Sequence, residues 1–369
     1  MSIDNLFVPL QLGKMTMPNR IVMPPLTRMR APLGVPTALS AEYYAQRASA
    51  GLIITEAASI TADANGYPDM PGIYTDEQIA GWKEVTRAVH EKGGRIVMQI
   101  VHSGRTSHSL YNADRSLPVA PSAIAPASGQ AFTPEFSLVE FETPRALRTD
   151  ELAGIVESFR QAAVNAIAAG FDGVELHSAN GYLLDQFLQD GSNHREDEYG
   201  GSIGARARLL IETVDAVSKA IGPDRVGVRL SPHGNFNDMH DSDPIALFSY
   251  LIGRLNTFGL AYLSLIEPRS SSIGLAEDIS IDSANNAQLF RRMFNGPVLS
   301  AGGYTAETAG EAILAGHADA IGFGRAFIAN PDLVSRLMSE AALNKHNRST
   351  FYGGDRVGYT DYPVLERQA

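Results

Sequence analysis

Residues 149–177 read TDELAGIVESFRQAAVNAIAAGFDGVELH and contain one complete helix-to-strand unit. Thr149 or Asp150 can cap a helix whose apolar residues recur at helical spacing, and Gly170 is suited to end it. The apolar run from Gly173 to His177 then has the length and composition of a buried strand. This segment therefore predicts a helix that packs beside a strand in an α/β fold.

The same alternation of short β-rich runs and helical patterns extends along the chain. Several of these runs are apolar throughout, which favours parallel strands covered on both faces. A strand followed by a helix eight times predicts a (β/α)8 TIM barrel, with residues 1–369 forming one domain. An open doubly wound sheet with a second domain is the alternative, and no strand opens into the G-x-G-x-x-G turn that would support it. The eight candidate strands are Asn19–Leu26, Leu52–Ile60, Arg95–His102, Gly173–His177, Val226–Ser231, Ala261–Glu267, Pro297–Ala301 and Ala320–Gly324.

Three segments exceed what a barrel needs. They are the first 18 residues, a polar excursion at about 103–144 after the third strand, and the tail after Glu340. We expect an N-terminal cap, a lid or cap subregion and a C-terminal extension, because additions of this kind cover an end of the barrel.

The composition narrows the class of protein. A net charge of -11 argues against nucleic acid or an anionic membrane as a partner. The chain has no cysteine, which excludes disulfides, thiolate catalysis and cysteine-ligated metal. Neither a signal peptide nor a membrane-spanning run is visible, so we expect a cytoplasmic protein, as a monomer or homodimer.

Functional groups of such barrels gather at the carboxyl ends of the strands. The loops after the last two strands carry Gly302 and Gly303, then Gly324 and Arg325. Backbone N–H groups in glycine turns and an arginine favour a phosphate at this position. The alternative is that the glycines only permit tight turns and that Arg325 forms a surface ion pair.

Several long motifs occur in order from about Leu6 to Pro363. They include NRIVMPPLTRMRA, AEYYAQRASAGLIITEA, HSANGYLLDQFL, NHREDEYGGS, VRLSP, FGRAFIANPDL and GYTDYP. Together they resemble the old yellow enzyme family, particularly its bacterial N-ethylmaleimide and nitrate-ester reductase branch. The resemblance implies an FMN-dependent barrel that uses NADPH or NADH as hydride donor.

The resemblance also implies a set of cofactor-binding residues. Thr27 and Gln99 would bond the polar edge of the flavin, and Arg229 would lie where the reduced flavin accumulates negative charge. A structural arginine held by a carboxylate is the alternative for Arg229. The complete implied set is Pro25, Leu26, Thr27, Ala57, Gln99, Arg229, Gly302, Gly303, Gly324 and Arg325.

The substrate side is implied by the turn after the fourth strand. His177 and Asn180 would donate hydrogen bonds to one substrate oxygen, and Tyr182 would be the general acid. Metal binding is the competing interpretation, but asparagine is a poor ligand and no H-E-x-x-H spacing occurs. Tyr67 and Tyr359 look like pocket walls, although each could equally anchor a loop.

Val101 departs from the family pattern. Many relatives have Gln-Leu-Trp-His at the third strand, whereas this chain has QIVH, with Val101 in place of the tryptophan. We hypothesise that Val101 opens a lobe of the substrate pocket.

The predicted activity is ping-pong ene-reduction of α,β-unsaturated carbonyls, maleimides or nitroalkenes, with nitrate esters and quinones as further candidates. Two alternatives stay open. One is an isomerase or aldolase that binds a phosphorylated metabolite without flavin, and the other is a flavin-binding sensor without turnover.

Overall fold

A closed ring of eight parallel strands forms the centre of the computed structural model, which describes residues 2–268 and 285–365. Each strand is hydrogen-bonded to the next along the chain, and pairing of β15 with β3 closes the ring. A short strand, β5 (Ala58–Ser59), lies beyond β4 and also pairs with β6. The barrel strands are β3 (Ile21–Met23), β4 (Leu52–Ile54), β6 (Ile96–Val101), β11 (Gly173–Ser178), β12 (Val226–Leu230), β13 (Tyr262–Ile266), β14 (Val298–Ala301) and β15 (Ala320–Gly322). The predicted (β/α)8 barrel and its eight strands are confirmed, although most strands are shorter than expected.

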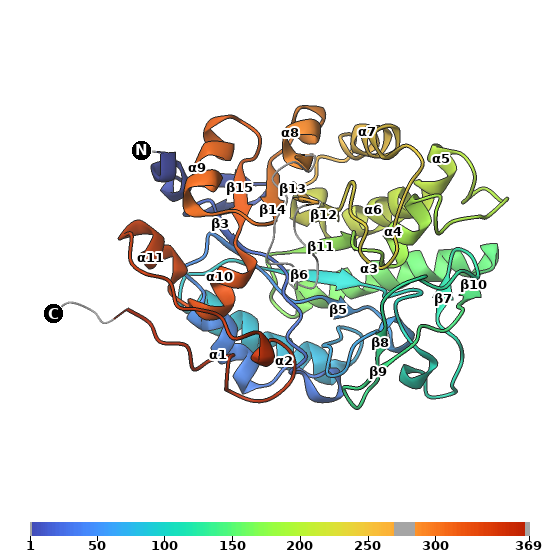
Figure 1. The fold of residues 1–369 in the computed structure, drawn as a ribbon, viewed down its shortest axis with the longest axis horizontal. Helices are drawn as coiled ribbons and strands as arrows, with labels where there is room; N and C mark the ends of the chain where they lie inside the picture. Colours follow the sequence, from blue (N-terminus) through green and yellow to red (C-terminus); the bar gives the residue numbers. More distant parts are fainter. Residues whose placement is uncertain (1, 269–284, 366–369) are drawn as a thin grey trace.

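Helices surround the strands (Figure 1). The predicted helix at 149–169 begins with a 3₁₀ turn, η5 (Thr149–Glu151), and continues as α3 (Leu152–Ala168). Gly170 then adopts a φ of 91°, which ends the helix in a conformation that glycine accepts readily. The other helices are α1 (Ala38–Gln46), α2 (Asp76–His90), α4 (Leu183–Leu188), α5 (Ile203–Arg206), α6 (Arg208–Ile221), α7 (Pro244–Leu255), α8 (Asn286–Phe290), α9 (Ala306–Leu314), α10 (Gly324–Ala329) and α11 (Leu333–Met338).

The N-terminal segment covers the amino-terminal end of the barrel. Its hairpin pairs β1 (Leu10–Leu12) with β2 (Met15–Met17), and Lys14 at the turn forms an ion pair with Asp224, just before β12. Leu12, Met15 and Met17 are buried against side chains inside the barrel. This end is therefore closed by apolar packing, and the predicted cap is confirmed.

The excursion after β6 and the C-terminal tail lie near the opposite end. The excursion contains η4 (Ser109–Tyr111), β7 (Val119–Ala120), β8 (Ala131–Phe132), β9 (Leu138–Val139) and β10 (Arg145–Ala146). β8 and β9 form an antiparallel hairpin, and β7 pairs with β10 in parallel. The tail includes η8 (Arg348–Thr350), and its carbonyl groups accept hydrogen bonds from Arg28, Arg30 and Arg47.

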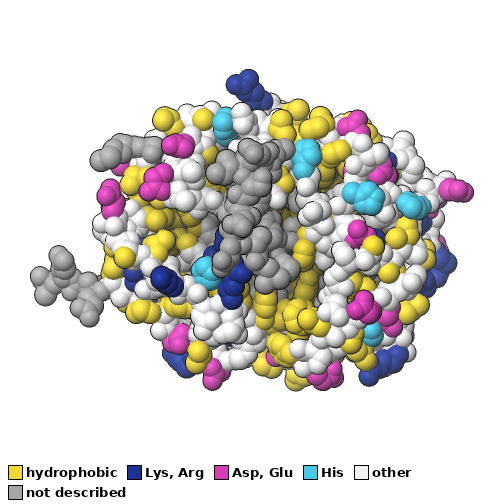
Figure 2. Space-filling view, viewed as in Figure 1, with side chains coloured by type: hydrophobic (Ala, Val, Ile, Leu, Met, Phe, Trp, Pro, Cys, Tyr) yellow, Lys and Arg dark blue, Asp and Glu magenta, His cyan; other side chains and the backbone are white. Residues whose placement is uncertain are grey.

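The surface carries mixed charges. On the face seen in Figure 2, acidic and basic side chains are interspersed and form no large basic patch. Among the described helices, none is long and apolar enough to cross a membrane.

Candidate active site

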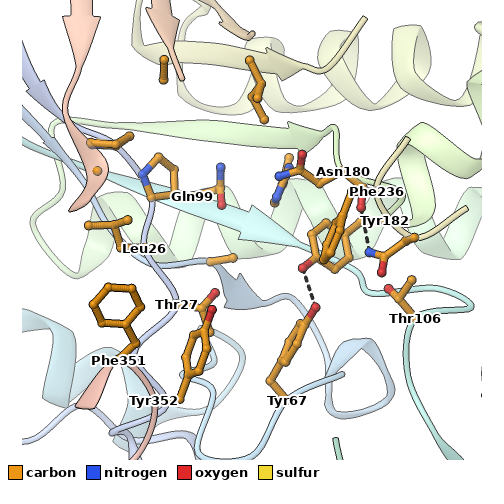
Figure 3. A pocket seen from close by; sticks show the side chains of 18 of the residues that line it. Leu26, Thr27, Tyr67, Gln99, Thr106, Asn180, Tyr182, Phe236, Phe351 and Tyr352 are labelled. Atoms are coloured by element: carbon orange, nitrogen blue, oxygen red, sulfur yellow. Dashed lines mark hydrogen bonds between the residues drawn. The ribbon is translucent and has the colours of Figure 1, made fainter. Parts of the chain in front are cut away.

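A cavity of about 660 Å³ opens at the carboxyl ends of the barrel strands. Its walls are built from residues at or just beyond the ends of the strands, together with parts of the excursion and the tail (Figure 3). Most of the residues predicted to form a site meet here. They are Pro25, Leu26, Thr27, Ala57, Tyr67, Gln99, His177, Asn180, Tyr182, Arg229, Gly302, Gly303, Gly324 and Arg325.

Gln99 and Arg229 present polar groups from neighbouring parts of the barrel wall. Gln99 Nε2 donates to Glu175 Oε1 at 2.7 Å. Arg229 Nη1 donates to Ser264 Oγ at 3.1 Å and lies 4.0 Å from the Glu175 carboxylate. Burial lowers the pKa of Arg229, and the Glu175 carboxylate opposes this change. Both side chains are therefore held in place from behind while they line the cavity.

The loops after β14 and β15 form the glycine-rich part of the wall. Gly302 and Gly303 have φ values of 138° and 67°, which side-chain-bearing residues rarely adopt. A Cβ at Gly322 would lie 2.9 Å from the Ala301 Cβ, so glycine is required for the close packing of β14 and β15. Arg325 lies three positions after Gly322 and is half-buried. The backbone can thus approach a ligand closely beside a cationic side chain.

The turn after β11 positions the predicted catalytic residues. Asn180 adopts a φ of 59° and Gly181 one of 75°, a sharp turn that asparagine and glycine tolerate best. The backbone N–H of Asn180 donates to Ser231 Oγ at 2.8 Å, and the backbone N–H of Gly181 donates to Asp185 Oδ2 at 2.9 Å. Burial raises the pKa of Asp185 to about 6. This network fixes the turn against β12 and against the start of α4.

His177 is almost fully buried and its Nδ1 has no hydrogen-bond partner among the described residues. Burial lowers the pKa of His177 well below its usual value, and the nearby Arg229 guanidinium lowers it further. The imidazole is therefore neutral near pH 7. A neutral ring that lines the cavity is suited to hydrogen-bond a ligand rather than to carry charge.

Tyr67 and Tyr182 form a pair of phenols on one side of the cavity. Their hydroxyl oxygens lie 2.8 Å apart and point toward each other (Figure 3). Burial raises the pKa of Tyr67 to about 12 and that of Tyr182 well above its usual value. The His177 ring packs edge-on against Tyr182 at 4.8 Å between ring centroids. Both phenols stay protonated at neutral pH.

Two predicted substrate contacts are not part of the cavity wall. Tyr359 is fully buried and stacks on Tyr43 with 4.0 Å between centroids, because the tail turns inward toward α1. Its prediction as a pocket wall is wrong, and the loop-anchor alternative describes it better. Val101 is also buried, and it packs in one cluster with Tyr182 and Met70 behind the cavity surface. Val101 therefore does not line the cavity itself, and the hypothesis that a smaller residue in place of tryptophan opens a lobe stays a prediction.

Several lining residues of the cavity were not predicted from the sequence. Those from the excursion are Phe132, Leu138 and Phe141, those from the loop after β12 are Phe236 and Asn237, and those from the tail are Phe351 and Tyr352. Tyr304 follows the glycine pair after β14 and could have been found from that position. The others lie in two-residue strands or in irregular segments, where no hydrophobic periodicity is visible, so no local pattern identifies them.

The charges of the cavity fit a flavin mononucleotide. Among the described residues that line it, the only ones with permanently charged side chains are Arg229 and Arg325, and no carboxylate lines it. An anionic phosphate fits beside Arg325 and the glycine loops, and a ring that becomes negative on reduction fits beside Arg229 and Gln99. The fold and site therefore define a flavin-dependent oxidoreductase of the (β/α)8 barrel class.

Comparison with known proteins identifies the family. The model of the NADH:flavin oxidoreductase / NADH oxidase family matches residues 5–344. The chain is 45% identical over 364 residues to 12-oxophytodienoate reductase 1 of Oryza sativa subsp. japonica, covering 98% of this chain and 93% of that protein.

Solved structures agree with this assignment. Morphinone reductase in complex with tetrahydroNAD matches with a TM-score of 0.92 and 49% identity over 98% of both chains. An old yellow enzyme homologue from Zymomonas mobilis matches with a TM-score of 0.92 and 43% identity, over 98% of this chain and 100% of that one. The chain belongs to this family and is an NAD(P)H-dependent flavin oxidoreductase of the old yellow enzyme type, with FMN as cofactor. The narrower N-ethylmaleimide and nitrate-ester reductase branch stays a prediction.

Proposed function

We propose that the protein is an ene-reductase that reduces activated C=C bonds of α,β-unsaturated carbonyls, maleimides and nitroalkenes. One observation carries this proposal: His177, Asn180 and Tyr182 line the same cavity as the cofactor-binding set. When bound there, FMN supplies hydride transfer from the nicotinamide to the β carbon of the alkene. The cavity then serves both partners in turn, in a ping-pong cycle.

His177 and Asn180 bind and orient the substrate. A neutral imidazole and an amide can both donate to one carbonyl or nitro oxygen, which polarises the conjugated alkene. Two hydrogen bonds hold the backbone of Asn180. Its N–H donates to Ser231 Oγ, and Asn237 Nδ2 donates to its carbonyl oxygen at 2.8 Å. Its side chain is thereby aimed from a rigid turn.

Tyr182 supplies the proton to the α carbon. Its hydroxyl is protonated at neutral pH, and Tyr67 is in place to hydrogen-bond the phenolate that remains. We infer that aromatic residues of the excursion, such as Phe132, cover a flat substrate and exclude water, because they form part of the cavity wall.

The two alternative functions have less support. An aldolase of the Schiff-base type needs a lysine in the cavity, and an isomerase typically needs a carboxylate base. Neither residue type occurs among the described lining residues. A sensor that binds flavin without turnover has no specific observation in its favour.

Spectroscopy of the purified protein tests the proposal. We expect a yellow protein that NADPH or NADH bleaches without oxygen, and that 2-cyclohexenone or N-ethylmaleimide recolours. A colourless preparation that does not take up added FMN would contradict it. Bleaching without recolouring by any enone, maleimide or nitroalkene would leave the sensor as the better description.

Steady-state comparison of substrates resolves the finer assignment. Rates with N-ethylmaleimide and with a nitrate ester, measured beside 2-cyclohexenone, test the predicted branch. Rates with the two nicotinamides at matched concentrations establish the preferred hydride donor. Negligible rates with both maleimide and nitrate ester, beside fast enone reduction, would reject that branch.

A further inference from the structure

Glu175 is a fully buried carboxylate inside the barrel that the proposed mechanism does not use. It belongs to a group of polar side chains on four neighbouring strands, with a step of two residues between β11 and β12, where Glu175 is opposite Gly227 and Arg229 is opposite His177. Gln99 on β6 is the register partner of Glu175 on β11, and Arg229 on β12 is that of Ser264 on β13. Glu175 does not line the cavity, whereas Gln99 and Arg229 do.

Glu175 contacts the side-chain amide of Gln99. An ionised carboxylate only accepts hydrogen bonds, and Gln99 Nε2 donates to Glu175 Oε1 at 2.7 Å. The Gln99 carbonyl oxygen and its second N–H are then left for another partner. In this orientation the Gln99 side chain offers one acceptor and one donor side by side. An imide edge, in which an N–H lies beside a carbonyl oxygen, is complementary to this pair.

Glu175 also faces the cation of the cavity. The Arg229 guanidinium lies 4.0 Å from Glu175 Oε1, and its only hydrogen bond within the described residues is to Ser264. Burial raises the pKa of Glu175, and the Arg229 charge and the Gln99 amide oppose this rise. One carboxylate thus contacts the amide and partly balances the arginine.

We propose that Glu175 is a positioning residue for FMN, which orients Gln99 toward the flavin's pyrimidine edge and moderates the charge that Arg229 presents to the reduced ring. This inference rests on the proposed placement of that edge at Gln99 and Arg229. It adds a residue behind the cavity wall to the determinants of cofactor affinity and redox potential.

Two variants separate the two roles. Glu175→Gln removes the charge and no longer dictates the amide orientation, whereas Glu175→Asp keeps the charge but is too short to reach Gln99. The holoenzymes are compared in two ways. Release of FMN on dilution is followed by flavin fluorescence, and the two-electron midpoint potential is measured by reductive titration.

For Glu175→Gln we expect about tenfold weaker retention of FMN, the effect of one charge-assisted hydrogen bond. Its midpoint potential should also rise, by about 30 mV for each tenfold gain in preference for reduced over oxidised flavin. For Glu175→Asp we expect weaker retention with the wild-type potential. Asp241→Asn, which alters a buried carboxylate that pairs with Arg206 and does not line the cavity, is the control and should change neither quantity.

Wild-type retention in both Glu175 variants would overturn the orienting role, and a wild-type potential in Glu175→Gln would overturn the charge role. If Glu175→Gln does not fold, Glu175→Asp decides the orienting role by its retention of FMN. The midpoint potential of Glu175→Asp then decides the charge role. This variant keeps the negative charge, so a shifted potential would overturn that role. A wild-type protein without FMN would instead reject the proposed function.

Discussion

The hydroxyl oxygens of Tyr67 and Tyr182 lie 2.8 Å apart at the cavity wall, although the two residues are 115 positions apart in the sequence. Tyr182 comes from the turn after β11 and Tyr67 from a loop between β5 and α2. The pair joins a proposed proton donor to a second phenol that can stabilise its conjugate base.

Tyr182→Phe should slow the reoxidation of reduced enzyme by 2-cyclohexenone about a hundredfold, because general acid catalysis contributes on this order. Tyr67→Phe keeps the donor and removes one hydrogen bond, so it should slow the same step by about tenfold or less. Stopped-flow measurement of each half-reaction tests this, with reduction by the nicotinamide unchanged as the internal control. Wild-type reoxidation in Tyr182→Phe would mean that solvent supplies the proton.

His177 should give no pH dependence of enone affinity between about pH 7 and 9, because its pKa is lowered by burial and by Arg229 and the ring is already neutral there. Titration of enone binding to the oxidised enzyme across this range is the measurement. A change in affinity that disappears in His177→Asn would show that the imidazole titrates.

Acid stability should reveal the same lowered pKa. A histidine that resists protonation in the folded state contributes stability above its unfolded pKa of about 6.5, and this stability is lost as the pH falls below that value. Wild type should therefore lose more free energy of unfolding between pH 7 and 5 than His177→Asn, by up to about 1.4 kcal/mol per pH unit. Denaturant titrations at the two pH values measure the difference, and equal losses would contradict the assignment.

Val101→Trp should disturb Tyr182 rather than fill a free lobe. Val101 is buried in one cluster with Ala57, Met70 and Tyr182, so a larger ring overpacks this cluster at a cost of about 1–3 kcal/mol. We expect a lower unfolding midpoint and slower enone reduction, with Val101→Ile as the milder control. Unchanged stability with altered selectivity on prochiral enones would instead place the new ring in the cavity.

Arg28→Met should loosen the tail that carries Phe351 and Tyr352. Arg28 is fully buried and donates to the Phe351 carbonyl at 2.9 Å and to the Gly358 carbonyl at 2.7 Å. Loss of these charged donors should cost about 3 kcal/mol and raise the KM for enones, because the tail forms part of the cavity wall.

The matched control is Arg356→Met, which removes an exposed ion pair with Glu42. It should change stability by less than about 1 kcal/mol. Thermal unfolding and steady-state kinetics of both variants test the prediction. Equal, small effects would show that the tail is held by other contacts.

The fold and the inner part of the site could be predicted from local sequence. Eight apolar runs separated by helical patterns can pack in few ways. The carboxyl ends of the strands then bring four residues to the same end of the barrel, namely Thr27, Gln99, His177 and Arg229. The sharp turn at Asn180 and Gly181 was likewise foreseeable, because these residue types accept its dihedral angles.

The sequence by itself therefore determined the barrel, the order of its strands and the strand-end part of the cavity wall, since hydrophobic periodicity and glycine placement are local properties. Only the tertiary structure decided which residues of the excursion and the tail reach the cavity. It placed Tyr352 at the wall and buried Tyr359 seven residues later, although both are tyrosines in an irregular segment. That choice depends on where Arg28 and Arg30 hold the tail, through contacts more than 300 residues apart that no local pattern encodes.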